Sequence, residues 1–183
     1  MPCEDQNRAR ASGAHGPAYG CLFCRTGNEL QIGRAIERDN ENIQTLFAEK
    51  LRKRRIQRAY VEEREPLFPG YLFFRTSADF EAQSLSQKPD VYRLLYSESG
   101  DWRLYGSDER FAQNLFEENG LLGFSRAYYE GDRIRIVDGP LKAYEGRIIR
   151  VNRRACTAQV RLSMCGRETC IWLGFELMEE MKR

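Results

Sequence analysis

The cysteines are the residues of this chain whose spacing most closely matches a chemical site. Four of them form two pairs, Cys21-x-x-Cys24 and Cys165-x4-Cys170, and a structural zinc site needs four ligands that converge on one point. Cys21 and Cys24, however, lie in a strand-like segment, where residues three apart point to opposite faces. The only histidine, His15, lies in the N-terminal tail. We therefore expect no metal and no cofactor, and we expect most of the thiols to pack as small apolar groups.

The sequence also shows no arrangement of side chains that points to catalysis. No histidine is placed to orient a serine or cysteine nucleophile, and no glycine-rich phosphate loop occurs. The carboxylates are scattered through surface-type sequence, and spacing singles out no pair for acid–base catalysis. We therefore predict that the protein is not an enzyme.

Positive charge is sorted into local patches, although the net charge of the 183-residue chain is only +2. The run KLRKRRIQR, residues 50–58, contains no acidic residue, and Glu62, Glu63 and Glu65 follow shortly after it. The C-terminal third of the chain also carries more basic than acidic residues. Such patches suit contact with an anionic partner. The alternative is a solvated face whose cations meet nearby acids.

An apolar turn lies in the segment PLFPGYLFF. Proline and glycine in Phe68-Pro69-Gly70-Tyr71 indicate a turn, yet this turn carries two aromatic residues. Apolar patches kept at a surface are typical of partner sites, and aromatic anchors are common in such interfaces. The alternative is that Phe68 and Tyr71 fold back into their own core.

The elements that position these residues begin after a polar tail, residues 1–17, which we expect to be disordered. Residues 19–25 form a predicted strand, and TGNE at 26–29 fits a capping box for the helix that follows. Residues 46–48 are predicted as a second strand leading into the basic run. A helix over residues 41–56 competes with that prediction, because its apolar residues also keep helical spacing.

The next segments complete an N-terminal domain over residues 18–121. Residues 71–75 are predicted as a buried strand, and a helix capped at residues 76–79 is ended by Pro89. A strand over 91–96 and a helix from Ser107 follow. The order β-α-β-β-α-β-α predicts an α+β sandwich with helices on an antiparallel sheet.

A different pattern begins near Tyr128. Ile134 and Ile136 alternate with arginines, and several short strands follow at close spacing, which predicts a small β-barrel over residues 128–181. A linker over residues 122–127 would join the two domains. Strand-like alternation over residues 131–175 argues against a helical alternative for this domain.

Both domains resemble bacterial NusG-type transcription elongation factors. Residues 131–146 look like a KOW motif, while YGCLFCRTGNE and LFPGYLFF look like the first strand and central turn of the NusG N-terminal domain. TGNE, the junction SRAYYEGDRI and the C-terminal MCGRETCIWLGFELM are similar to the specialised LoaP-like antiterminators. The chain departs from the family at Tyr19-Gly20, where Trp-Tyr is usual. It also has Cys165-Gly166-Arg167 where housekeeping members have Phe-Gly-Arg.

The resemblance implies a transcription antitermination and elongation factor that docks on the clamp helices of RNA polymerase. An RNA hairpin in the nascent leader would recruit it, and it would suppress pausing and termination. The implied polymerase-binding residues are Phe68, as anchor, with Pro69, Gly70 and Tyr71. The implied KOW partner surface comprises Tyr144, Gly166 and Arg167. The departure at Cys165 puts contacts with Rho or with a small-subunit ribosomal protein in doubt.

Candidate RNA-binding residues form two sets. The set on the hairpin after the second strand comprises Lys50, Arg52, Lys53, Arg54, Arg55 and Arg58. The set in the barrel comprises Arg147, Arg150, Arg153, Arg154, Arg161 and Arg167. Arginine can pair with phosphates or guanine edges, and hairpin loops expose bases that stack. Charged strand edges, which are common in small barrels, are the alternative.

Two other functional classes stay open at this point. A ribosome-associated KOW RNA-binding protein would explain the basic residues but would leave the apolar turn unused. A zinc or thiol redox module would explain little beyond the cysteine spacing. The N-terminus lacks the apolar region of a secretory signal, and no apolar run reaches the roughly 18 residues of a membrane span. We therefore expect a cytoplasmic monomer that does not contact membrane.

Overall fold

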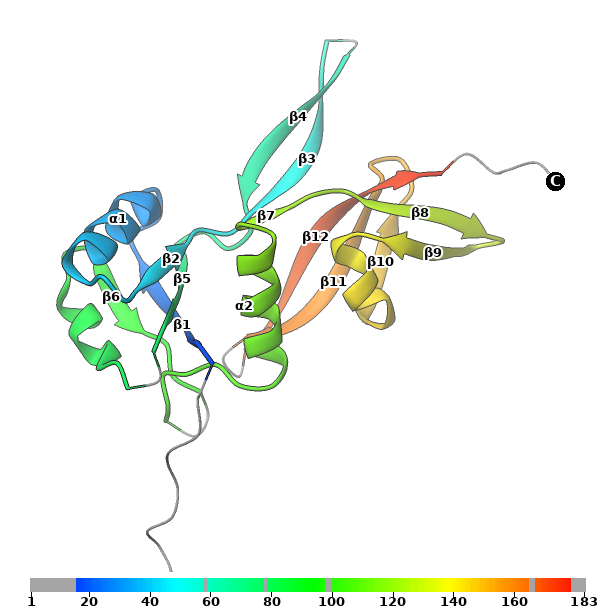
Figure 1. Cartoon of the computed structure of the whole chain (residues 1–183). Helices are drawn as coiled ribbons and strands as arrows, with labels where there is room; N and C mark the ends of the chain where they lie inside the picture. The colour runs from blue at the N-terminus through cyan, green and yellow to red at the C-terminus, as the bar shows by residue number, and fades with distance from the viewer. Residues whose placement is uncertain (1–15, 58, 78, 98–99, 165–166, 179–183) are drawn as a thin grey trace, which may run out of the picture.

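A four-stranded antiparallel sheet organises the N-terminal part of the chain (Figure 1). The computed structural model describes residues 16–57, 59–77, 79–97, 100–164 and 167–178. The sheet has the order β2-β5-β1-β6, and its strands are β1 (Ala18–Cys24), β2 (Gln44–Leu46), β5 (Tyr71–Thr76) and β6 (Val91–Leu94). The predicted strands at 19–25 and 71–75 are confirmed. The strand predicted over 91–96 ends at Leu94, and the predicted N-terminal tail lies mostly outside the described residues.

Two helices cover the opposite faces of this sheet. On α1 (Glu29–Asp39), Ile32 and Ile36 pack in one buried cluster with Leu22 and Cys24 of β1. The second helix, α2 (Ser107–Glu117), packs in another cluster that contains Cys21. Because β1 alternates between the two clusters, the prediction that Cys21 and Cys24 point to opposite faces is confirmed. The result is the expected sandwich.

A long hairpin of β3 (Glu49–Ile56) and β4 (Ala59–Pro66) projects from the sandwich (Figure 1). At its base, β3 also pairs in parallel with the short β7 (Leu121–Leu122). The competing helix over residues 41–56 is therefore wrong. The partner strand supplies the physical reason, since Lys50, Arg52 and Lys53 lie directly opposite the glutamates of β4. Opposite charges at cross-strand positions stabilise the pairing.

Two local predictions differ from the structure. The helix expected before Pro89 is a short 3-10 segment, η1 (Ala82–Gln87). Thr26 does not cap α1, because Asn28 occupies the N-cap position and makes no side-chain capping bond. The carboxylate of Glu29 does reach back as expected, but its partner in this turn is the N–H of Gly27. With Thr26 as the N-cap, Gly27 would be the first helical residue, but its φ of 91° is not helical.

The C-terminal part is a five-stranded half-barrel in the order β10-β11-β12-β8-β9. Its elements are β8 (Ser125–Glu130), β9 (Arg133–Asp138), η2 (Pro140–Arg147), β10 (Ile148–Asn152), β11 (Thr157–Met164) and β12 (Arg167–Leu177). Inward residues such as Val160, Ile171 and Leu173 form its core. In the described part of the chain, β9 and β10 do not pair, so the sheet is open there. β8 begins inside the segment expected as a linker.

The half-barrel packs directly against the sandwich. One buried cluster contains Phe73 and Phe111 of the sandwich together with Leu162 and Leu173 of the half-barrel. The rings of Phe111 and Tyr144 lie 6.1 Å apart across the junction. The α2-facing side of the sandwich and the half-barrel therefore share one buried cluster. The helices of the described ranges are too short or too polar to cross a membrane.

Candidate functional site

The apolar turn between β4 and β5 is built from stacked aromatic rings. Phe68 is half-buried and lies 5.9 Å from the ring of Phe111 and 6.1 Å from the ring of Tyr71. Pro69 is exposed, whereas Gly70 is buried. The turn thus lies at the edge of the α2-facing core and contributes to it from one side.

Glu29 holds the backbone of this turn in place. Its carboxylate accepts hydrogen bonds from the N–H of Gly70 (2.8 Å) and the N–H of Gly27 (2.7 Å), and the side chain is almost fully buried. The N–H of Cys24 donates to the carbonyl of Gly70 at 2.8 Å. Gly70 has a φ of 82°, and a Cβ there would lie 3.0 Å from the ring of Phe23, so only glycine fits well. These contacts fix the direction of Phe68.

An aromatic row continues from the turn across the end of the sheet. Phe23 on β1 lies 5.3 Å from the ring of Tyr71 and 5.8 Å from that of the exposed Tyr92. The guanidinium of Arg93 lies 5.5 Å from the centre of the Phe23 ring. Sequence reasoning missed Phe23, Tyr92 and Arg93, because only the register Tyr71↔Phe23↔Arg93 brings them beside the turn.

The half-barrel covers the part of this row nearest the turn. A cavity of about 290 Å³ lies between the two parts, with Phe68 and Tyr71 on one side and Met164 and Arg167 of the half-barrel on the other. Tyr144 lies against α2, and this burial raises its pKa above the ordinary value, although a hydrogen bond with Asn114 partly opposes the shift.

The residues expected at the two partner surfaces therefore face each other. Phe68 and Tyr71 belong to the expected polymerase-binding set, whereas Tyr144 and Arg167 belong to the expected KOW partner surface. Gly166, the third member of the KOW set, lies outside the described residues.

Most cations of the basic hairpin are paired with acids. Lys50 and Arg52 both lie 3.1 Å from the carboxylate of Glu65, and Arg54 lies 3.4 Å from that of Glu63. Although burial alone would raise it, the hydrogen bonds from Lys50 and Arg52 hold the pKa of Glu65 below its ordinary value.

The other hairpin cations differ from one another. Lys53 reaches the half-barrel and pairs with Glu176 at 2.5 Å. Arg55 has no carboxylate partner in the described part of the chain, and Arg58 lies outside it.

Most arginines of the half-barrel set are exposed and lack such partners. Arg153 bonds to Asp132 at 3.2 Å and lies over the ring of Tyr129 at 4.4 Å. The remaining members make no ion pair with any described carboxylate; they are Arg147, Arg150, Arg154, Arg161 and Arg167. The two predicted cationic sets therefore differ in their ion pairs. Most cations of the hairpin set pair with carboxylates, whereas most arginines of the half-barrel set pair with no described carboxylate.

The two cysteines of the sandwich behave as packing residues, whereas Cys156 and Cys170 of the half-barrel are half-buried and exposed. Cys21 and Cys24 are fully buried, and burial, together with Glu29 and Asp90, raises the pKa of Cys24 to about 11. Cys3 and Cys165 lie outside the described residues. Within the described ranges, histidine, cysteine and carboxylate side chains do not gather in threes as metal ligands would.

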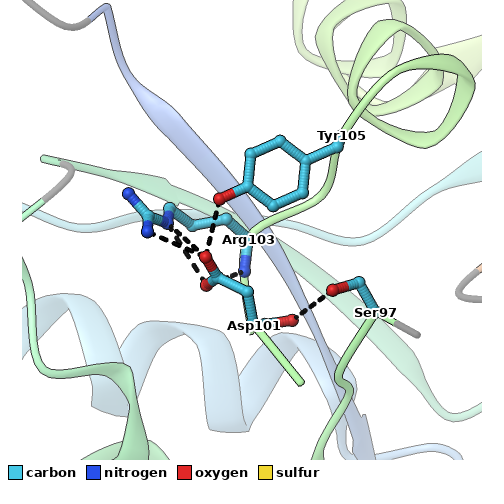
Figure 2. Close-up of polar contacts among 4 residues, drawn as sticks. All are labelled: Ser97, Asp101, Arg103 and Tyr105. Atoms are coloured by element: carbon cyan, nitrogen blue, oxygen red, sulfur yellow. Dashed lines mark hydrogen bonds and ion pairs between the residues drawn. The ribbon is translucent and has the colours of Figure 1, made fainter. Parts of the chain in front are cut away.

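A polar cluster fixes the loop between β6 and α2 (Figure 2). The carboxylate of Asp101 accepts hydrogen bonds from the guanidinium of Arg103 (2.8 Å) and from the hydroxyl of Tyr105 (2.6 Å). The Ser97 hydroxyl donates to the Asp101 carbonyl at 3.0 Å. The bonds from Arg103, chiefly, and from Tyr105 hold the pKa of Asp101 well below its usual range. Since Asp101 is satisfied within the loop, we assign the cluster a structural role.

Residues 19–121, more than half of the chain, match the sequence model of the family described as transcription termination factor nusG. The chain belongs to the NusG family. It is 30% identical over 135 residues to the transcription termination/antitermination protein NusG of Synechocystis sp., covering 67% of this chain and 65% of that protein. NusG of Thermus thermophilus is 27% identical over 125 residues, covering 61% and 66%. The match thus spans slightly less than two thirds of the length of these relatives.

The fold likeness extends beyond the N-terminal sandwich. A solved structure described as domain interaction in Thermotoga maritima NusG covers 88% of this chain, and 96% of that chain is matched, with a TM-score of 0.53 and 21% identity. The likeness shows that the sandwich and the half-barrel together follow a NusG fold.

Proposed function

We propose that this chain is a transcription antitermination factor that docks on the clamp helices of RNA polymerase and suppresses pausing and termination. Family membership supports a role in transcription, because both curated relatives are named as transcription termination/antitermination proteins. The finer proposal is a LoaP-like factor that an RNA hairpin in the nascent leader recruits. The TGNE turn at 26–29 and the junction SRAYYEGDRI support it.

The observation that carries the docking proposal is the apolar turn with its fixed backbone. Phe68 and Tyr71 present aromatic rings at the end of the sheet, and Phe23 extends the row. Aromatic side chains are frequent anchors of interfaces, and a turn held by Glu29 loses little conformational freedom on binding. Docking across the clamp would favour the elongating state of polymerase by binding that state better.

Docking requires the half-barrel to move away from the turn. The cavity between Phe68 and Met164 shows that the aromatic row is partly covered in the closed arrangement. Opening frees the turn for polymerase, and it also frees Tyr144 and Arg167 for a second partner such as a small-subunit ribosomal protein. Because only open molecules can dock, the apparent affinity for polymerase is the intrinsic affinity multiplied by the fraction of molecules that are open.

The test uses the purified full chain and stalled elongation complexes of bacterial RNA polymerase. We expect the chain to bind these complexes and to increase read-through of a terminator placed behind a leader RNA selected for binding. A chain that binds small ribosomal subunits but leaves polymerase unbound would instead be a ribosome-associated RNA-binding protein.

A further inference from the structure

The outward face of β10, β11 and β12 carries polar and aromatic side chains that polymerase docking does not use. Along β11, Ala158, Val160 and Leu162 are buried in the half-barrel, so Gln159 and Arg161 between them point outward. Along β12, the half-buried Trp172 alternates in the same way with buried neighbours.

Strand register places these side chains in rows. Arg150 of β10 lies opposite Gln159 of β11, and Gln159 lies opposite Trp172 of β12. In the neighbouring row, Arg161 lies opposite Cys170. Because side chains opposite each other share a face, an arginine, an amide and an indole form one continuous line across three strands.

The charge of this face is positive and largely unpaired. Arg150 and Arg161 are exposed, and neither pairs with a carboxylate of the described residues. On β8 and β9, by contrast, Arg126 pairs with Asp138 and Arg135 pairs with a glutamate. Glu168 is the acidic residue nearest in register to Arg161, and both border one hollow together with Arg147.

The base of the basic hairpin lies beside this face. A hollow of about 320 Å³ separates the hairpin base from the half-barrel, and its lining includes Lys50, Arg52, Phe124 and Trp172. The ammonium of Lys50 donates to the Trp172 carbonyl at 2.9 Å. The tryptophan therefore borders a groove with the hairpin cations and Glu65 on one side and the strands of the half-barrel on the other.

We propose that this face binds single-stranded RNA, with one base stacked on the indole of Trp172. Gln159 meets a base edge, and Arg150 and Arg161 meet backbone phosphates. The inference rests on the proposed recruitment by RNA and narrows its ligand to unpaired nucleotides, such as those of a hairpin loop. An A-form duplex stacks its bases internally, whereas single strands offer base faces to aromatic side chains. Arg150 and Arg161 are exposed in the closed arrangement, so the face is accessible there beside the hairpin.

The test uses the full chain carrying Trp102→Phe, which leaves Trp172 as the only tryptophan. The probes are a single-stranded RNA of about 12 adenines and cytosines, within the range of site sizes for such surfaces, and a blunt duplex of the same strand with its complement. We expect the single strand to quench Trp172 fluorescence and the duplex to leave it unchanged. Trp172→Leu should weaken single-strand binding roughly tenfold or more, while Trp172→Phe should retain most of it.

The surface variant Gln159→Ala with Arg150→Ala provides a second measurement that does not disturb the core. It should weaken single-strand binding while the circular dichroism spectrum is unchanged. RNA binding with unaltered Trp172 fluorescence, or equal affinity for the duplex, would overturn the stacking site and leave RNA recruitment standing. If the unmodified chain also fails to bind a leader hairpin RNA selected from a random pool, recruitment by RNA is wrong as well.

Discussion

At the scale of single residues, the shape of the apolar turn depends on Glu29. Its two carboxylate oxygens each accept a backbone N–H, from Gly27 and Gly70. Glu29→Gln keeps one acceptor oxygen but replaces the other with an NH2 group, which cannot accept a hydrogen bond. One buried backbone N–H therefore loses its partner. We expect a loss of about 1–3 kcal/mol in the free energy of unfolding, measured by urea denaturation.

The matched control for this substitution is Glu41→Gln, at an exposed position without a partner among the described residues. It should change the free energy of unfolding by less than about 0.5 kcal/mol. Equal stability of the two variants would mean that Glu29 does not hold the turn.

Asp101 gives a pH-dependent prediction at the same scale. Its pKa is lower in the folded chain than in the unfolded chain, so its contribution to stability is present above the unfolded pKa and is lost as the pH falls. Asp101→Asn should lower the free energy of unfolding by about 1 kcal/mol at neutral pH, a modest value because the pair with Arg103 is partly exposed.

The difference between the wild-type chain and Asp101→Asn should narrow below about pH 4, where the unfolded aspartate takes up a proton. Urea denaturation at neutral pH and near pH 3 measures both differences. A difference that grows on acidification would contradict the assignment of the Asp101 cluster as a stabilising contact.

At the scale of elements, sequence pattern predicted what depends on neighbours along the chain. Strands β1 and β5 followed from their nearly continuous apolar segments, and helix α2 followed from the spacing of its apolar residues. The segment 41–56 stayed ambiguous, because Leu46, Phe47 and Leu51 keep helical spacing as well. The deciding fact is the row of glutamates on β4 opposite the basic strand, and that pairing is not local. The same limit hid Phe23 and Tyr92, whose place beside the turn depends on register.

The two cationic elements should differ in their response to salt. Replacing Arg150, Arg154 and Arg161 with alanine should reduce the slope of log affinity against log salt for single-stranded RNA by up to about 2, since each phosphate contact contributes about 0.7. Replacing Lys53, Arg54 and Arg55 should reduce it less, because two of these cations already pair with acids. A larger effect of the hairpin replacement would assign RNA contact chiefly to the hairpin.

At the scale of the whole molecule, the sequence did not predict that the half-barrel lies over the turn. Strand periodicity identifies a buried face, but it does not tell which surface of one domain meets which surface of another. The contact rests on Phe111 against Tyr144 and on the shared apolar cluster. Closure therefore couples the two proposed partner surfaces, since opening exposes both.

Loosening this contact should strengthen polymerase binding. Tyr144→Ala removes the ring that lies against Phe111 without altering the turn, so the open fraction rises and the apparent affinity rises with it, by up to about tenfold. Glu176→Gln is the control, because the single exposed pair with Lys53 contributes little. Binding of the full chain to elongation complexes measures both. Unchanged or weaker binding by Tyr144→Ala would contradict closure as a barrier to docking.

The most direct test of docking through the turn is Phe68→Ala in the Tyr144→Ala background, where closure interferes least. We predict that Phe68→Ala weakens binding of the full chain to elongation complexes, with a loss of about 1–3 kcal/mol in binding free energy. This is the cost of truncating an interface anchor. Tyr128→Ala, which removes an exposed ring on β8, should leave that affinity unchanged. A folded Phe68→Ala chain that binds polymerase as tightly as its parent would contradict docking through the turn.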